Sequence, residues 1–476
     1  MAIVGGGISG LSAALRLTEL DPGCRLTLWE ASGRLGGVLS TLHEHGFQVE
    51  QSADNFITTV PWGVDLCKRL GLIDELVHTN PAHRQTFVVR RGRLHKLPDG
   101  FLMMAPTRLW PLALTPILSP IGKMRAGLEY FIPPRTDDGD ESMAAFVRRR
   151  LGREVFQRLV EPLVSAVYAA DMEKLSLLAT LSQFRDMERK HGSLIRAMRH
   201  QIASAKKAPA QSGARYSMFV TPRSGLSSMV HAIAGRLPQG AVRLNAPVER
   251  IELLEDRRWR LYVGPGQHED YDALILATPA YVAGQLLRPV APDLAADLAS
   301  IEYSGTAVLS VGFERSQVGH RLDGMGAVVP AIERSPMLAC SFSSQKYPHR
   351  APEDQVLLRI FAGGARRPEL AEMDAASLEP LLLAELSKLL AIRGEPIYRN
   401  LARWPATMPQ YHVGHRDLVR RIECRRAELP HLELAGNAFS GVGIPHCVHS
   451  GETAAERTLG LRRESSSARG GKTNGR

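Results

Sequence analysis

Apolar residues near the N-terminus follow a strand–helix–strand pattern. Residues 2–4 form a short apolar run, residues 11–20 place apolar side chains at helical spacing, and residues 25–29, R-L-T-L-W, have the pattern of a second strand. Short apolar strands that alternate with amphipathic helices are typical of a parallel sheet covered by helices. The pattern therefore predicts an α/β domain at the start of the chain.

Further along, helical periodicity gives way to strand patterns. Between residues 143 and 204 apolar side chains recur at helical spacing, whereas short runs between residues 291 and 422 alternate or are continuously apolar, as in a mixed sheet. The four-residue helical repeat is Leu151, Val155, Leu159, Leu163 and Val167, and the predicted strands are 308–313, 326–329, 337–342 and 355–361, with a hairpin over 87–97 and a helix over 379–390.

A glycine-rich turn follows the first predicted strand. Gly5, Gly7 and Gly10 fill the pattern G-x-G-x-x-G, and Glu30 lies 20 residues after Gly10, at the end of the second strand. In dinucleotide-binding folds these glycines allow a tight turn, close approach of a pyrophosphate and close packing of helix on strand, while the acid accepts hydrogen bonds from a ribose. Strand, turn, helix and acid thus predict a dinucleotide site with the phosphates at the helix N-terminus.

The next turn indicates which dinucleotide is bound. After Glu30 the chain continues A-S-G-R-L-G-G, in which Arg34, Gly36 and Gly37 provide a fixed cation and further N–H donors. This run resembles the flavin amine oxidase superfamily, which includes amine oxidases, phytoene desaturases and protoporphyrinogen oxidases. The resemblance implies FAD rather than NAD.

The resemblance extends over nearly the whole chain. The A-T-P turn at 277–279 and the run A-G-N-x-x-x-G-V-G-I-P at 435–445 match family motifs. In this family a backbone segment centred on Val248 holds the adenine ring, and the helix after the C-terminal motif directs its dipole at the flavin. Since residues 437–440 contain no cysteine, the implied FAD is non-covalent. The implied flavin contacts in the C-terminal motif are Gly436, Val442, Gly443 and Ile444.

Three further segments, at 152–163, 342–350 and 404–415, resemble the protoporphyrinogen oxidase branch of the superfamily. That branch implies removal of hydride equivalents from protoporphyrinogen IX in three steps to give protoporphyrin IX for haem biosynthesis, with dioxygen as acceptor and hydrogen peroxide as product. Because the cofactor carries this chemistry, no catalytic acid, base or metal site is assigned. Oxidation of coproporphyrinogen III to coproporphyrin III, a flavin amine oxidase activity and a non-catalytic flavin-binding partner are the alternatives.

The resemblance also implies a wall of the substrate site. Phe342 is expected against the macrocycle, with Val328 and Thr306 on the same wall, although ordinary core packing explains each of them equally well. Plant relatives hold a propionate with an arginine near the predicted hairpin. Thr86 occupies that position here, and the nearby Arg84 is the predicted substitute.

The predicted fold class is α/β (α+β overall), with a Rossmann-type FAD-binding domain, a mixed-sheet substrate domain and a helical insertion. Polar segments at 133–142 and 206–215 indicate linkers. The predicted domains are an FAD-binding domain of 1–78, 216–284 and 405–462, a substrate-binding domain of 79–102 and 285–404, a helical domain of 103–215 and a disordered tail of 463–476.

Charge and cysteine content narrow the partners and the compartment. The net charge of +10 suits an anionic substrate or an anionic membrane surface, and no nucleic-acid-binding module is recognised, so no nucleic acid is expected. Five scattered cysteines without a C-x-x-C pair favour a reducing compartment. No signal peptide is expected before a strand that starts at residue 2, which predicts a cytoplasmic protein.

Residues 101–131 are apolar, are interrupted by prolines and carry Trp110 and Tyr130 near basic residues. Two interpretations stay open for this segment: peripheral contact with the inner membrane, or the core of a helical domain. Its longest uncharged run, 109–122, has 14 residues, whereas a spanning helix needs about 20. A homodimer is compatible with the sequence.

Overall fold

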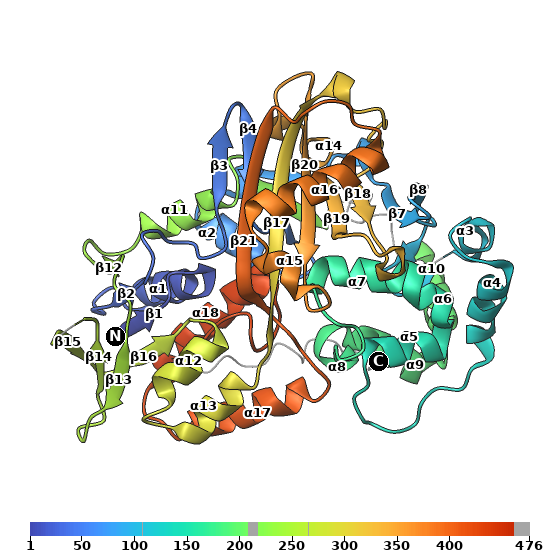
Figure 1. The fold of residues 1–476 in the computed structure, drawn as a ribbon. Helices are drawn as coiled ribbons and strands as arrows, with labels where there is room; N and C mark the ends of the chain where they lie inside the picture. The colour runs from blue at the N-terminus through green and yellow to red at the C-terminus, as the bar shows by residue number, and fades with distance from the viewer. Residues whose placement is uncertain (107, 208–217, 265, 461–476) are drawn as a thin grey trace.

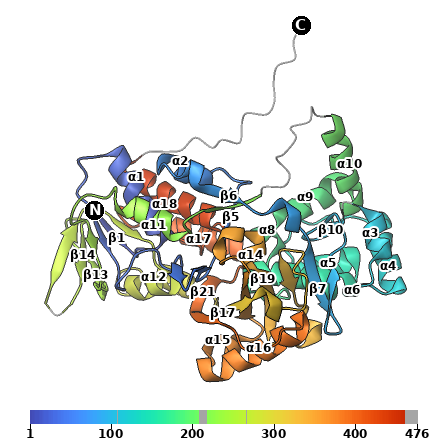
Figure 2. The ribbon, with the colours of Figure 1, turned by 90° about the horizontal axis from the view of Figure 1, so that it is seen from above.

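The computed structural model describes residues 1–106, 108–207, 218–264 and 266–460. Figure 1 shows a parallel sheet with its helices on the left, a tall mixed sheet in the upper centre and a group of helices on the right. Figure 2 shows the same three regions from above: segments from distant parts of the chain lie together in the two sheet regions, whereas the helices α3 to α10 come from one stretch of the chain.

The parallel sheet has five strands in the order β12-β2-β1-β16-β22. The first strand pairs in parallel with β2 on one side and β16 on the other, so that chain from beyond residue 240 completes a sheet begun at residue 2. The strand–helix–strand pattern predicted for the N-terminus is confirmed. The strands are β1 (Ala2–Val4), β2 (Thr27–Trp29), β12 (Val242–Arg243), β16 (Leu274–Leu276) and β22 (Leu432–Leu434).

Alternate residues of these strands face two different cores. Ile3, Leu28 and Ile275 pack against α1, α11 and α18, whereas Val4 and Trp29 pack against a three-stranded antiparallel sheet and α12 and α13. Both faces of the sheet are therefore covered, as expected for parallel strands. The covering elements are α1 (Ile8–Leu20), α11 (Ser227–Ala234), α18 (Ile444–Thr458), β13 (Arg250–Leu253), β14 (Trp259–Tyr262), β15 (His268–Tyr271), α12 (Ala280–Leu287) and α13 (Pro292–Ala299).

The mixed sheet has seven strands in the order β21-β17-β20-β19-β18-β7-β8. Only the pair of β18 and β7 is parallel, and helix α16 covers one face with four leucines spaced four residues apart. The predicted strands, the hairpin and the helix are confirmed. The elements are β7 (Thr86–Arg90), β8 (Arg93–Lys96), β17 (Tyr303–Glu314), β18 (Gly326–Val328), β19 (Met337–Phe342), β20 (Gln355–Gly363), α16 (Ala375–Leu390) and β21 (Tyr398–Pro409).

The helical region departs from the predicted four-residue repeat at a π-helical turn, Phe156–Val160. A π turn places more residues in each turn than an α-helix and so shifts the buried face. Val160 and Val164 are fully buried as a result, while Val167 is 50% exposed. The helices are α3 (Leu109–Leu114), α4 (Pro120–Gly127), η3 (Leu128–Phe131), α5 (Met143–Leu151), α6 (Arg153–Val155), η4 (Phe156–Val160), α7 (Glu161–Tyr168), α8 (Leu177–Thr180), α9 (Ser182–His191) and α10 (Leu194–Lys207).

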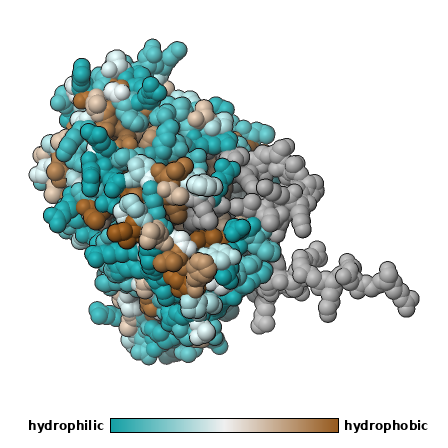
Figure 3. Space-filling model, turned by 90° about the vertical axis from the view of Figure 1, so that its right-hand side faces the viewer, coloured by the Kyte–Doolittle hydropathy of each residue, from teal (hydrophilic) through white to brown (hydrophobic). Residues whose placement is uncertain are grey.

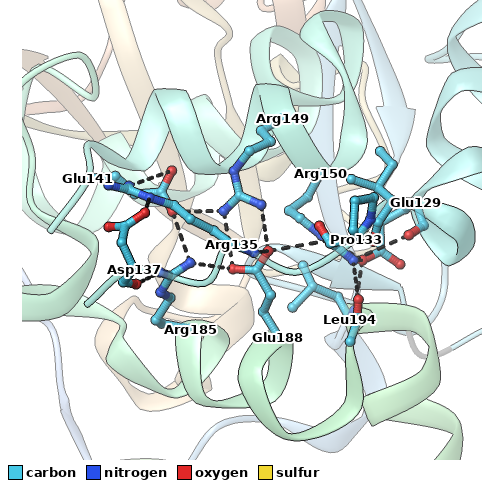
Figure 4. Close-up of polar contacts among 12 residues, drawn as sticks. Glu129, Pro133, Arg135, Asp137, Glu141, Arg149, Arg150, Arg185, Glu188 and Leu194 are labelled. Atoms are coloured by element: carbon cyan, nitrogen blue, oxygen red, sulfur yellow. Dashed lines mark hydrogen bonds and ion pairs between the residues drawn. The ribbon is translucent and has the colours of Figure 1, made fainter. Parts of the chain in front are cut away.

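A buried ionic network joins these helices (Figure 4). Glu129 and Arg150 form an ion pair in which neither side chain has exposed surface. Glu129 also accepts hydrogen bonds from the Ser193 hydroxyl at 2.6 Å and from the Leu194 N–H at 2.8 Å, at the start of α10. One carboxylate therefore satisfies both an internal arginine and a helix N-terminus.

The predicted domain boundary between residues 404 and 405 falls inside β21, so no break in structure marks it.

Smaller elements connect the three regions. The connecting elements are β3 (Thr41–Glu44), β4 (Phe47–Glu50), β5 (Phe56–Ile57), α2 (Trp62–Arg69), η1 (Ile73–Glu75), β6 (Leu76–His78), η2 (Pro81–His83), β9 (Phe101–Leu102), β10 (Ala105–Pro106), β11 (Phe219–Pro222), η5 (Arg315–Gln317), η6 (Ala331–Glu333), α14 (Ser343–Lys346), η7 (Pro348–Arg350), α15 (Pro368–Glu372) and α17 (His415–Arg426).

Within the described ranges, no helix combines the length and the apolar character that crossing a bilayer requires. The predicted tail, 463–476, lies outside the described residues.

Candidate active site

The first glycine turn leaves open space at the start of α1. Gly5 has φ +106°, and a Cβ at Gly10 would lie 1.9 Å from the Gly5 carbonyl oxygen, so both positions require glycine. Gly7, by contrast, has ordinary extended backbone, and a Cβ there would have no atom within 4 Å. Gly7 is the N-cap of α1 and provides no side-chain cap, which leaves the first N–H groups of the helix available to a ligand.

The second glycine turn lies beside the first. The Gly36 N–H donates to the Gly6 carbonyl at 2.8 Å, and Gly37 has φ +59°. The Arg34 guanidinium donates to the carbonyl oxygens of Gly37 at 2.6 Å and Leu35 at 3.3 Å. Arg34 therefore holds the turn in shape, and its predicted contact with a pyrophosphate remains a prediction.

Glu30 lies at the end of β2, between the two turns. Its carboxylate accepts hydrogen bonds from the Gly6 N–H at 2.7 Å, the Ser32 N–H at 2.8 Å and the Ser32 hydroxyl at 2.7 Å. The Glu30 carbonyl accepts from the Ala246 N–H at 3.0 Å, which brings the segment of Val248 alongside. The structure thus gathers the predicted ribose and adenine contacts at one edge of the parallel sheet.

A second helix N-terminus accompanies that of α1. Gly443 is the N-cap of α18 and provides no side-chain cap. The two helices are in close contact, since a Cβ at Gly451 would lie 2.0 Å from the Ser9 carbonyl oxygen, and Arg16 of α1 pairs with Glu456 of α18 at 2.8 Å. Since residue numbers increase in the same order along both helices from one contact to the next, α1 and α18 run in the same direction. Their N-terminal, positive dipole ends therefore point to the same side of the molecule.

The other predicted residues of the C-terminal motif lie around this helix start. Gly436 has φ +141° and its N–H donates to the Ser450 hydroxyl at 3.0 Å, Ile444 is the first residue of α18 and is buried, and Val442 packs against the core of the helical region. These features fit an elongated flavin dinucleotide. They are the two helix starts without side-chain caps, the open space at Gly7 and the Glu30 carboxylate at the end of β2.

Tyr411 connects this motif to the run 404–415. Its hydroxyl donates to the Asn437 carbonyl and accepts from the Gly441 N–H at 2.9 Å, while the His415 ring stacks on it with centroids 4.1 Å apart. Burial raises the pKa of Tyr411 and lowers the pKa of His415 to about 4. Both rings are therefore neutral at pH 7, and the run acts as a support for the turn that precedes α18.

A buried ionic cluster that the sequence did not predict lies beside the loop at 51–56. Asp54 accepts from Lys346 at 2.7 Å and pairs with Arg350 and Arg359. Burial alone would raise the pKa of Asp54, but the Arg350 guanidinium, with Lys346 and Arg359, lowers it well below its usual range. Asp54 and its partners lie about 300 positions apart in the sequence. The motif at 342–350 could have drawn attention to Lys346 and Arg350, but nothing in the sequence indicates that they pair with Asp54.

The mixed sheet corrects the predicted substrate wall. Val328 is opposite Ala339, Ala339 is opposite Phe361, and Phe361 is opposite Val308 of β17. Thr306 lies two residues before Val308 and so is on the same face of the sheet as Val328. The prediction that Phe342 shares this wall is wrong. Phe342 lies on the opposite face, fully buried in the core that also contains the leucines of α16, with its ring centroid 5.9 Å from that of His320 and 6.3 Å from that of Phe87.

A cavity of about 420 Å³ opens at the end of this sheet, between α7 and the loops after β18 and β20. Gly363 and Val329 line the cavity. Thr306 pairs with Gly363 across the sheet, and Val328 is the residue before Val329. Arg84 is exposed before β7 and is not among the lining residues. The roles of Thr306, Val328 and Arg84 toward a substrate stay predictions.

The parallel sheet, the two glycine turns and the paired helix starts have the arrangement that dinucleotide-binding folds share. The chain belongs to the family of flavin-containing amine oxidoreductases, whose model matches residues 8–459. The predicted family and fold class are thereby confirmed, and a flavin is the cofactor that the family implies.

Relatives of known name cover nearly the whole chain. The sequence is 31% identical to a coproporphyrinogen III oxidase of Staphylococcus aureus (96% of this chain, 98% of the relative) and 33% identical to one of Bacillus subtilis (96% and 97%). It is 30% identical to a chloroplastic protoporphyrinogen oxidase of Nicotiana tabacum (96% and 85%). A crystal structure from Exiguobacterium sp. 255-15, provisionally assigned as a protoporphyrinogen oxidase, matches with a TM-score of 0.86 and 32% identity over 97% of this chain and 98% of that one.

Proposed function

We propose that the protein oxidises a porphyrinogen to the corresponding porphyrin, with non-covalently bound FAD and with dioxygen as electron acceptor. Similarity to porphyrinogen oxidases over 96% of the chain carries the proposal. Coproporphyrinogen III is the first candidate substrate because bacterial relatives of that name match from end to end. Protoporphyrinogen IX, which the sequence predicts, is the second.

The residues of the chain bind and orient the reactants. The N–H groups at the start of α1 would take the pyrophosphate, Glu30 the ribose, and the start of α18 the flavin edge that becomes negative on reduction. Bound FAD supplies two-electron oxidation, and three such oxidations remove six electrons and six protons from the porphyrinogen while three dioxygen molecules become hydrogen peroxide. The absence of cysteine from 437–440 supports non-covalent binding.

The domain roles follow from the same arrangement. We assign flavin binding to the parallel-sheet region and substrate binding to the mixed sheet, because the face with Val328 and Thr306 continues into the cavity beside α7. The helical region closes the remaining side of that cavity with α7.

Oxidation of each substrate is expected to be visible as porphyrin fluorescence. Purified protein loaded with FAD should convert coproporphyrinogen III in air well above the rate of autoxidation and release hydrogen peroxide, and protoporphyrinogen IX, run in parallel, should react more slowly. A faster reaction with protoporphyrinogen IX would reverse the order of substrates. A protein that holds FAD and oxidises neither would overturn the proposed function and redirect the assay to amines.

We also propose that the helical region attaches the protein to the surface of an anionic membrane. Large apolar side chains stand exposed on α3, α4 and η3, and Figure 3 shows brown patches on this side of the molecule. Trp110 is 79% exposed, and the basic residues Arg108 and Lys123 lie among them. Such a mixture suits the bilayer interface. The apolar platform consists of Trp110, Leu114, Ile121, Met124, Leu128 and Phe131.

Removing two aromatic side chains from the platform is expected to reduce membrane binding about 30-fold, since full burial of each is worth about 2 kcal/mol, half insertion of each about 1 kcal/mol, and every 1.4 kcal/mol is a factor of ten. Co-sedimentation with vesicles of phosphatidylglycerol and phosphatidylcholine would compare Trp110→Ser/Phe131→Ser with Leu381→Ser/Ile397→Ser, which changes two exposed residues elsewhere. Equal sedimentation of the two variants would contradict membrane contact. A dimer in light scattering that only the platform variant dissociates would instead show a second copy on this surface.

A further inference from the structure

The cavity beside α7 has an apolar wall and a basic rim. Ala169, Ala170, Met337 and Leu338 line its wall, and three arginines, Arg334, Arg366 and Arg367, contribute to its lining. Its volume of about 420 Å³ is in the range of small-molecule sites. A ligand that fits both features is apolar in its body and anionic at its edge.

The three guanidinium groups are only partly neutralised by neighbours. Arg366 lies 3.4 Å from the Glu161 carboxylate, and Arg367 pairs at 2.5 Å with Glu369, an exposed residue. Arg334 forms no ion pair or side-chain hydrogen bond with any residue that the structure describes. At least one guanidinium at this cavity is therefore available to a carboxylate.

Glu161 shapes the cavity rather than cancelling its charge. Its carboxylate accepts from the Ala331 N–H at 3.1 Å, which fixes the loop that carries Arg334. Burial raises the pKa of Glu161, because the charged form loses its hydration. The rim thus keeps a net positive charge whichever form Glu161 takes.

Backbone contacts connect the cavity to the predicted substrate wall. The Ala169 carbonyl accepts from the Ser304 hydroxyl at 3.1 Å and from the Ala365 N–H at 2.8 Å, so α7, β17 and the loop after β20 meet at one point. Thr306 lies two residues further along β17, opposite Gly363. A macrocycle against Val328 and Thr306 would extend its edge into the cavity.

We propose that this cavity is the subsite for the carboxylate side arms of the porphyrinogen, with Arg334 and Arg367 as the contacts that hold them. The inference rests on the proposed function, since it takes the substrate to be a tetrapyrrole with propionate arms. Arg84, predicted for this role from the sequence, lies outside the cavity lining.

The test compares a double variant, Arg334→Gln/Arg367→Gln, with wild type and with Arg420→Gln. Arg420 is an exposed arginine of α17 whose ion pair is with Asp417 at 3.3 Å, so its loss changes the net charge at a distant place. Fluorescence titration of each FAD-loaded protein would measure the Kd of coproporphyrin III and of its tetramethyl ester, which has no charge. Steady-state assays would measure KM and kcat for coproporphyrinogen III.

The double variant should bind coproporphyrin III at least about tenfold more weakly than wild type, since hydrogen bonds to charged groups are worth about 1.5–3 kcal/mol each. Its Kd for the ester and its kcat should stay within twofold of wild type, and its KM should rise in step with the Kd. Unchanged binding of the acid, or an equal loss in Arg420→Gln, would overturn the subsite. A wild-type protein that binds the acid more tightly than the ester but oxidises no porphyrinogen would overturn the proposed function alone.

Discussion

Replacing Gly7 by alanine is expected to weaken FAD binding by about 100-fold, or about 2.8 kcal/mol, while the flavin-free protein still folds. The Cβ would enter the open space at the start of α1, where no protein atom lies within 4 Å and where the phosphates are proposed to bind. Because alanine is a poorer N-cap than glycine, the flavin-free variant should lose at most about 1 kcal/mol of stability. Fluorescence quenching of FAD titrated with flavin-free protein gives the Kd.

Two other glycine substitutions serve as controls. Gly127→Ala also places a Cβ in open space at helical φ, but in the helical region, so its FAD affinity should match that of wild type and its stability should be equal or higher by up to about 1 kcal/mol. Gly10→Ala puts the Cβ 1.9 Å from the Gly5 carbonyl oxygen, so it should damage the fold with or without FAD. Wild-type affinity in Gly7→Ala would show that the open space is not the phosphate site.

The contrast between Gly7 and Gly10 shows why the first glycine turn was predictable from sequence. Its parts are local, because strand, turn and helix all lie within residues 2–20. The glycine pattern that such a turn requires can therefore be recognised in a short stretch of sequence. The hairpin of β7 and β8 and the leucine face of α16 were predictable for the same reason, because period and turn chemistry are properties of short segments.

What sequence reasoning missed depends on register and on distant partners. Phe342 was expected beside Val328, but β19 places consecutive side chains on opposite faces, and which face Phe342 takes is fixed by its pairing with Leu358. Asp54 pairs with Arg350 and with Arg359 of β20, which lie about 300 positions further along the sequence, so no local pattern indicates these contacts. The π turn at 156–160 likewise shifts a repeat that looked continuous in the sequence.

The ion pair of Glu129 and Arg150 yields the prediction with the largest effect on stability. Glu129→Gln keeps the size of the side chain but removes the nearer charged partner of the Arg150 guanidinium, which has no exposed surface and keeps only Glu188, at 3.4 Å and shared with Arg149 and Arg185. Loss of one member of a buried pair costs about 3–5 kcal/mol, because the remaining charge is neither hydrated nor compensated. The free energy of unfolding should fall by that amount in urea titrations followed by circular dichroism.

A matched exposed pair on the same helix separates burial from charge. Arg148 of α5 pairs with Glu173, and the two side chains are 39% and 48% exposed, so Glu173→Gln should cost at most about 1 kcal/mol. Because Glu129 also accepts the Ser193 hydroxyl and two N–H groups at the start of α10, Glu129→Gln should in addition make α10 more susceptible to proteolysis. Equal costs for the two variants would mean that Glu188, 3.4 Å from Arg150, compensates the buried charge by itself.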